Sequence, residues 1–280
     1  MSDSSAGMLV LAATPIGNAA DASLRLRELI ETADLIAAED TRKFRDLARR
    51  LDVTVSAKVI SHHEHNESAR TGDLLDAVAA GQLVLVVSDA GMPTISDPGY
   101  PLIAAATSRD LPVTVAPGPS AVLTALAISG LATDRFTFEG FIPRKTGEKR
   151  RTFEAVATDP RTLVFFESPH RVRETLTVMG EVFGDERSVA ACRELTKTYE
   201  EVLRGSISDV LEQLPETPRG EFVIVVAGAQ QQAVKSVAEL VGNVIELTDH
   251  GARLKEAVAQ VAAGHGVSKR ELYEAVLATR

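Results

Sequence analysis

A buried strand that runs directly into a long polar loop constrains the fold of this chain more than any other stretch. Residues 83–87, LVLVV, are all apolar and mostly β-branched, as in a strand covered on both faces. The following loop, residues 88–99, contains two Asp, two Gly and two Pro. In open α/β sheets, ligands bind beyond the carboxyl ends of the strands. The stretch therefore predicts a ligand site at the end of this strand, although such a loop can also serve only to join a strand to a helix.

The first part of the chain alternates between short apolar strands and segments with helical spacing of apolar residues. We expect strands at 8–13, 34–38, 58–61, 83–87 and 112–116. This alternation is typical of a parallel sheet with helices on both faces. Because crossovers in such units are right-handed, the carboxyl ends of the strands share one edge. The turns expected to converge there are 14–18, 39–42, 88–99 and 117–120.

The pattern changes after the Pro-Gly-Pro-Ser turn at 117–120, which suits the start of a helix over 121–128. Only two helices are evident in the following part, after Ser168 and after Ser206. Strands without intervening helices indicate an antiparallel or mixed sheet. The strands expected there are 136–139, 162–167, 189–193, 199–204 and 221–227.

These patterns predict an α/β protein with several parts. The expected parts are a disordered start at 1–7, an N-terminal α/β domain at 8–118, a C-terminal α+β domain at 119–229 and a helical segment at 230–280. In the last part, helices at 252–263 and 268–278 flank a Gly-containing turn, and Ser268 with Glu271 forms a capping-box pattern. This outline is helix-turn-helix-like, and it fits either a nucleic-acid contact or a packing or dimer role.

Charge is distributed unevenly along the chain. The net charge of −9 argues against a protein that coats nucleic acid indiscriminately. Residues 41–50 and 144–151 nevertheless hold five basic residues each, which favours a local polyanion site, although solvated helix faces have the same composition. The residues expected to contact such a polyanion are Arg42, Lys43, Arg45, Arg144, Lys145, Lys149, Arg150 and Arg171.

Other features concern compartment and metal. The single cysteine, Cys192, excludes an internal disulfide and fits a reducing cytosol, and no apolar run approaches the ~20 residues of a membrane span. We therefore expect a cytoplasmic protein without membrane contact. The His62-His63-Glu64-His65 motif lacks a matching ligand set elsewhere, so we expect no metal and place this motif at an RNA or dimer surface.

Seven short motifs together resemble one known family. They are 13–18, 38–42, 88–99, 117–121, 138–143, 166–171 and 193–197. In this order they resemble the bacterial 16S rRNA (cytidine-2′-O)-methyltransferase branch of the tetrapyrrole (corrin/porphyrin) methylase superfamily. The resemblance spans Met8 to about Gly228, and the closing helices are similar to that branch's C-terminal segment. Met92 stands where the family usually has Thr, so we expect a backbone contact there to survive and a hydroxyl contact to be lost.

The resemblance implies two α/β domains of tetrapyrrole-methylase type in a homodimer, with S-adenosylmethionine bound between the domains. It also implies a role in rRNA processing, with a cytidine 2′-hydroxyl of 16S rRNA or the 30S subunit as the acceptor. The cofactor contacts carried over by position are Pro15, Ser88, Asp89, Met92, Ser120, Ala121, Glu167 and Leu195. The first strand is not followed by Gly-x-Gly-x-x-Gly, so the dinucleotide-binding fingerprint is absent.

The proton acceptor for such a transfer is left open by the sequence. A ribose hydroxyl is a poor nucleophile until its proton is removed, and the candidates are Glu167, His170, Asp40 and Lys197. Each of these also fits an ion pair. Two further functions are kept: a corrinoid or porphyrin methyltransferase of the same superfamily, which would have an apolar acceptor cleft without a basic rim, and a non-catalytic RNA-binding assembly factor.

Overall fold

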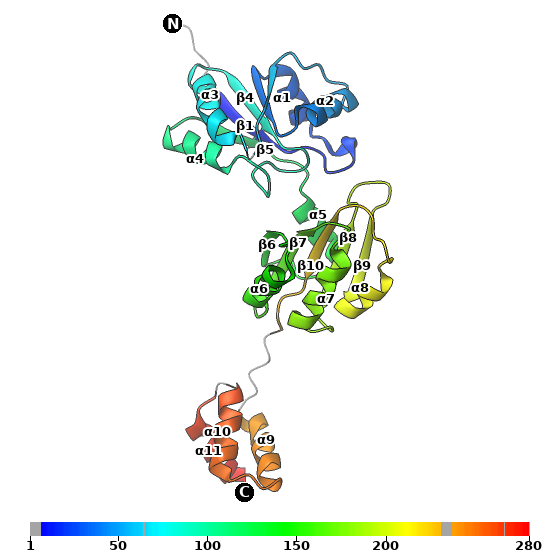
Figure 1. Cartoon of the computed structure of the whole chain (residues 1–280). Helices are drawn as coiled ribbons and strands as arrows, with labels where there is room; N and C mark the ends of the chain where they lie inside the picture. Colours follow the sequence, from blue (N-terminus) through cyan, green and yellow to red (C-terminus); the bar gives the residue numbers. More distant parts are fainter. Residues whose placement is uncertain (1–6, 64, 231–236, 266, 280) are drawn as a thin grey trace. The chain divides into compact units, whose positions relative to one another are not determined.

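The computed structural model describes residues 7–63, 65–230, 237–265 and 267–279. The chain divides into two compact units, Met1–Gly228 and Ala229–Arg280. Among its described residues, the first unit contains two five-stranded sheets (Figure 1). The domain boundary expected near residue 118 falls between these sheets and stays a prediction. Most of the expected disordered start lies outside the described residues, but Gly7 is buried, with the Val78 carbonyl oxygen 2.0 Å from where a Cβ would stand.

The first sheet is parallel throughout, with the strand order β3-β2-β4-β1-β5. Its strands are β1 (Met8–Ala12), β2 (Leu35–Ala38), β3 (Lys58–Ser61), β4 (Leu83–Val87) and β5 (Val113–Ala116). In β4, Leu85 and Val87 face one hydrophobic core, and Val84 and Val86 face another. Because successive side chains of a strand point to opposite faces, this alternation confirms that the stretch is covered on both sides.

Helices cover both faces of this sheet (Figure 1). Helices α1 (Leu24–Thr32) and α2 (Thr41–Arg50) contribute to the core on one face. Helices α3 (Glu67–Ala79) and α4 (Tyr100–Ser108) contribute to the core on the other face. A short 3₁₀ helix at Ala19–Asp21 follows β1. The parallel strands therefore end at one common edge, as the alternating pattern predicted.

The second sheet is mixed, with the order β6-β7-β10-β8-β9 and only β6 and β7 parallel. Its strands are β6 (Phe136–Phe141), β7 (Thr162–Glu167), β8 (Ser188–Arg193), β9 (Glu201–Ser206) and β10 (Phe222–Val226). Helix α5 (Ala121–Ser129) packs on one face, and α7 (Val172–Phe183) and α8 (Ile207–Gln213) pack on the other.

Helix α6 (Thr146–Val156) corrects the sequence analysis, which recognised only two helices in this part. Its sequence is strongly charged, and only Lys149 and Phe153 are buried, so the apolar periodicity that marks a helix is weak. Because α6 joins β6 to β7 as a crossover, these two strands pair in parallel.

The second unit contains α9 (Val237–Asp249), α10 (Leu254–His265) and α11 (Lys269–Thr279) around its own core. Helices α10 and α11 confirm the two predicted helices, and Ser268 Oγ accepts a hydrogen bond from the Glu271 N–H at 3.4 Å. Helix α9 lies within the predicted helical segment but was not given as a helix of its own, although Leu240, Val241 and Val244 are buried at helical spacing. Within the described residues, no helix has the length and hydropathy that a membrane crossing needs.

Candidate functional site

A cavity of about 500 Å³ lies where the turns of the first sheet meet the second sheet. It is lined by Ile16 after β1, Glu39 after β2, the loop after β4, the start of α5, the end of β7 and the start of β10. Small-molecule sites typically have volumes of roughly 300–1,000 Å³ and combine apolar walls with a few polar groups. The cavity is therefore large enough for a nucleoside-sized ligand.

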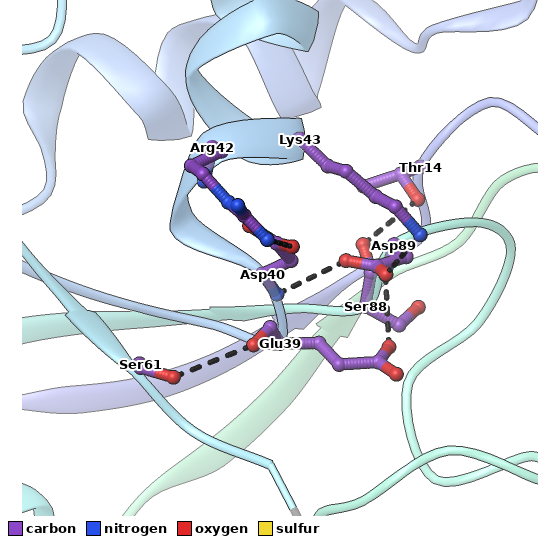
Figure 2. A network of polar contacts seen from close by, with 8 residues as sticks. All are labelled: Thr14, Glu39, Asp40, Arg42, Lys43, Ser61, Ser88 and Asp89. Carbon is purple, nitrogen blue, oxygen red and sulfur yellow. Dashed lines mark hydrogen bonds and ion pairs between the residues drawn. The ribbon is translucent and has the colours of Figure 1, made fainter.

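A polar network at the ends of β2 and β4 forms one wall (Figure 2). Asp89 Oδ1 accepts a hydrogen bond from the Asp40 N–H at 3.0 Å, and Asp89 Oδ2 accepts one from Lys43 Nζ at 2.7 Å. The Asp89 N–H donates to Glu39 Oε2 at 3.1 Å. These bonds join the turn after β2 to the turn after β4, which fixes the Asp89 carboxylate at the edge of the cavity.

The loop after β4 has an unusual backbone. Thr94 and Ser96 have φ values of 77° and 64°, in the left-handed region that non-glycine residues rarely adopt. The loop ends at Gly99, which has φ 129° and whose N–H donates to Glu67 Oε2 at 2.9 Å. Non-glycine residues in such conformations cost roughly 1–3 kcal/mol each and cluster at functional sites. Here they belong to the segment that presents Ile95, Ser96 and Asp97 to the cavity.

Asp97 is the carboxyl group that the sequence analysis missed. Burial, the nearby Glu39 carboxylate and Asp89 raise the pKa of Asp97 from 3.8 to about 6, against a hydrogen bond from Ser88 that lowers it. Burial disfavours the charged form of a carboxyl group, and a neighbouring negative charge has the same effect. Its position in a loop already identified as a ligand site was the available signal.

The start of α5 forms another wall. Ser120 caps the helix, with its Oγ accepting a hydrogen bond from the Leu123 N–H at 3.5 Å, and Ser120, Ala121 and Val122 line the cavity. The first N–H groups of a helix have no partner within the helix, so this end can bind polar or anionic ligand groups.

Glu167 at the end of β7 lines the opposite side but is fully engaged by the protein. Its carboxylate accepts hydrogen bonds from the Ser168 N–H and from Thr175 Oγ1, both at 2.6 Å. It also forms an ion pair with Arg171 at 2.6 Å. These contacts fix the turn after β7.

Comparison with known proteins identifies the family. The model of the tetrapyrrole (corrin/porphyrin) methylases matches residues 8–211. The chain belongs to this family.

Curated relatives match this methylase over nearly its whole length. A Ribosomal RNA small subunit methyltransferase I of Mycobacterium tuberculosis (strain CDC 1551 / Oshkosh) is 48% identical over 277 residues, which cover 99% of this chain and 96% of that protein. One of the same name from Streptococcus pyogenes serotype M1 is 43% identical over 272 residues, covering 96% and 94%.

Solved structures share the fold of this methylase at low sequence identity. A diphthine synthase matches with a TM-score of 0.61 and 12% identity, over 79% of this chain and 89% of that one. The methyltransferase CobJ matches with a TM-score of 0.59 and 18% identity, over 80% and 95%. These similarities confirm the predicted fold of two tetrapyrrole-methylase α/β domains.

S-adenosylmethionine is the methyl donor of this family, and the cavity of this methylase fits it. The donor carries a positive sulfonium, and the described lining residues include five carboxylate side chains and one cation, Lys43. This excess of negative charge favours a cationic ligand. Apolar walls from Ile16, Val122 and Leu195 suit the purine ring.

Six of the eight residues predicted to contact the cofactor of this methylase line the cavity: Asp89, Met92, Ser120, Ala121, Glu167 and Leu195. Pro15 and Ser88 are not among its lining residues. Ser88 is buried, and its Oγ donates to the Gly91 carbonyl at 3.3 Å. This hydrogen bond stabilises the loop conformation. The contacts themselves stay predictions.

The four candidate proton acceptors differ in their surroundings. Only Glu167 lines the cavity, and its oxygens are occupied by the donors described above. Asp40 forms an ion pair with Arg42 at 3.0 Å, and this hydrogen-bonded guanidinium holds the pKa of Asp40 well below its usual value. Lys197 loses basicity through burial, but hydrogen bonds to Glu194 and Glu221 raise its pKa overall. His170 is exposed and lies outside the lining.

The residues predicted to contact RNA fall into three groups. The prediction for Lys149 is wrong, because its side chain is 0% exposed and pairs with Glu174 at 3.1 Å. Arg45 and Arg144 are exposed and form no ion pair with any described residue. The remaining members form ion pairs with carboxylates: Arg42, Lys43, Lys145, Arg150 and Arg171.

The motif at residues 62–65 does not place all of its histidine side chains on the surface. His62 is 2% exposed, so the prediction that its side chain lines an RNA or dimer surface is wrong. Burial lowers the pKa of His62, which favours the neutral ring. Glu64 lies outside the described residues. Among the residues described, no group of three or more His, Cys, Asp or Glu side chains is arranged to hold a metal ion.

Proposed function

We propose that this methylase transfers a methyl group from S-adenosylmethionine to the 2′-hydroxyl of a cytidine in small-subunit ribosomal RNA. The observation that carries the proposal is the 48% identity to a Ribosomal RNA small subunit methyltransferase I over 99% of the chain. The cytidine and the 2′-oxygen come from the resemblance of the seven motifs. The cavity supports a methyl-transfer site, because its charge suits the donor and its position matches the predicted cofactor turns.

Different residues of the cavity are assigned to different parts of the donor. We assign the polar ends of the donor to the Asp89 carboxylate and to the N–H groups at the start of α5, and the purine to the apolar walls. When bound, the donor supplies a methyl group on a good neutral leaving group. The protein then contributes mainly by holding the acceptor oxygen about 3 Å from that methyl group and in line with the carbon–sulfur bond.

The proposed acceptor requires a polyanion to approach an acidic protein. With a net charge of −9, the chain repels phosphates at long range, so contact depends on local cations. Arg45 and Arg144 are the exposed candidates without carboxylate partners among the described residues. A homodimer, a cytoplasmic location and 16S rRNA or the 30S subunit as the partner complete the proposal.

Isotope transfer tests this function directly. The purified protein is incubated with methyl-labelled S-adenosylmethionine and small subunits from a strain that lacks the modification, and the label is mapped by mass spectrometry of RNA fragments. We expect a single 2′-O-methylcytidine. Parallel reactions with naked 16S rRNA show which form of the substrate is used.

Three outcomes contradict the proposal. Label on a base argues for another acceptor atom in the RNA. No label in RNA although calorimetry shows donor binding argues for another acceptor, such as a corrinoid or porphyrin. Absence of donor binding argues for a non-catalytic RNA-binding assembly factor.

A further inference from the structure

The carboxylates of the cavity are not equivalent. Among the described residues, five line it: Glu39, Asp89, Asp97, Glu167 and Glu221. Asp89 and Glu167 each accept hydrogen bonds on both oxygens. Glu39 Oε2 accepts from the Asp89 N–H, and Glu221 Oε2 accepts from Lys197 Nζ at 2.9 Å.

Asp97 differs from the other four in the donors that surround it. The donor beside its carboxylate is the neutral hydroxyl of Ser88, which shares its single proton with the Gly91 carbonyl, 3.3 Å from Ser88 Oγ. No cation or backbone N–H from the described residues is bound to its carboxylate. A proton acceptor must have an oxygen that is free to approach the reacting hydroxyl, and Asp97 meets this condition best.

We propose that Asp97 is a catalytic residue that accepts the proton of the acceptor hydroxyl during methyl transfer. This inference rests on the proposed function, because it requires an acceptor with an ionisable O–H group. Asp97 takes the place of the four candidates from the sequence. Glu167, Asp40 and Lys197 form ion pairs, and His170 lies outside the cavity lining.

The charges around Asp97 suit this role. Glu39 at the end of β2 and Asp89 at the end of β4 add negative charge, and burial raises the pKa of Asp97 further, to about 6. Lys43 on α2 is bound to Asp89, Glu67 on α3 is bound to the Gly99 N–H, and Glu167 and Glu221 are held as described above. A base with a pKa just below the working pH is deprotonated and still has useful basicity.

The proton and electron balance is complete with this residue alone. The O–H bond of the acceptor breaks and its proton passes to an Asp97 carboxylate oxygen. The electron pair of the acceptor oxygen forms the bond to the methyl carbon, while the carbon–sulfur bond breaks and leaves its pair on a neutral thioether. Asp97 then releases the proton to solvent.

The loop geometry supports the assignment. Thr94 and Ser96 adopt left-handed backbone conformations immediately before Asp97, and Pro98 and Gly99 follow it. Such conformations persist only where surrounding contacts hold them. They fix the path of the chain on both sides of the carboxyl group.

The test compares Asp97→Asn with the parent full-length protein. We expect kcat for the methyl transfer to fall by about 10²–10⁴-fold, the usual contribution of a general base. The donor Kd, measured by calorimetry, should stay within about threefold because Asp89 and α5 are unchanged. Asp134→Asn is the matched control, since Asp134 is exposed and outside the cavity lining, and it should match the parent in both.

The pH profile gives a second readout. Asp97 accepts a proton only as the carboxylate, so kcat/KM of the parent, which reports the pKa of the free enzyme, should rise with pH, about tenfold per unit, up to about pH 6 and level off above pH 7. Asp97→Asn should lack this rise. Carbon-13 NMR of the labelled parent should show a carboxyl group that titrates near pH 6 and is missing from the variant spectrum.

Several results would overturn the inference. They are a variant kcat within threefold of the parent, a loss of donor affinity that accounts for the whole loss of turnover, or an Asp97 carboxyl that titrates near pH 4. The NMR titration of the parent needs no turnover, so a value near pH 4 overturns the inference even if the variant folds poorly. Failure of the proposed function is distinct, because it is seen in the parent as label at another acceptor.

Discussion

At the scale of single residues, the charge of a residue in the sequence does not show whether its side chain is buried or exposed. Lys149 belongs to a run of five basic residues and yet is buried, with its ammonium group against Glu174. The Lys149 ammonium group, together with a hydrogen bond from Thr146 Oγ1, lowers the pKa of Glu174. The long aliphatic part of a lysine side chain can pack on apolar surface, which lets α6 use Lys149 as a core residue.

Replacing this buried lysine should therefore affect stability. We expect Lys149→Ala to lower the free energy of unfolding by about 3 kcal/mol, because it removes a buried stem and breaks a partly buried ion pair. Urea denaturation measures the change. Lys145→Ala is the control, since Lys145 is 82% exposed in its pair with Glu148, and exposed pairs contribute roughly 0–1 kcal/mol. Equal effects of the two substitutions would contradict the burial of Lys149.

At the scale of elements, helix α2 places three consecutive residues in three different environments. Successive residues of an α-helix are about 100° apart around its axis. Lys43 reaches Asp89 at the cavity, Phe44 is buried against the first sheet, and Arg45 is exposed. One helix therefore connects the cavity, the core and the surface that we assign to RNA.

The surface assignment can be tested through the salt dependence of RNA binding. Each phosphate contact that is removed should lower the slope of log Kobs against log salt by about 0.7–0.9. We expect Arg45→Ala and Arg144→Ala each to have this effect in titrations with small-subunit RNA. Arg109→Ala should leave the slope unchanged, because Arg109 follows α4 and is paired with Asp76 at 3.0 Å. If all three proteins keep the parent slope, Arg45 and Arg144 do not contact phosphates.

At the scale of the whole molecule, the two units are built around separate cores. Among the described residues, those that line the 500 Å³ cavity belong to Met1–Gly228. The core of the second unit is formed by α9, α10 and α11 among themselves. A domain with its own hydrophobic core can in principle fold alone.

A shortened protein tests this independence. We expect residues 1–228 to bind S-adenosylmethionine with a Kd within about threefold of the full chain, because the fragment keeps every lining residue that the structure describes. Isothermal calorimetry on both proteins provides the comparison. A loss of tenfold or more in a fragment that melts cooperatively would show that residues 229–280 contribute to donor binding.

Much of the fold was predictable from local patterns. The five strands of the first sheet, the mixed second sheet and helices α10 and α11 follow from apolar periodicity and from turn residues, which act over a few positions along the chain. Helices α6 and α9 escaped because one is highly charged and the other directly follows a polar, Gln-rich stretch. The loop at 88–99 was recognised as a ligand site, but Asp97 within it was not singled out.

The sequence by itself determined the order of the elements, the edge at which the turns meet and, through seven motifs in order, the family. Only the tertiary structure decided that Lys149 is buried, that Glu167 is held by Arg171 and Thr175, and that Asp97 lies in the cavity lining, where burial and nearby carboxylates raise its pKa. Secondary structure depends on neighbours along the chain, whereas burial and the pairing of charges depend on residues that only the folded backbone brings within a few ångströms of each other.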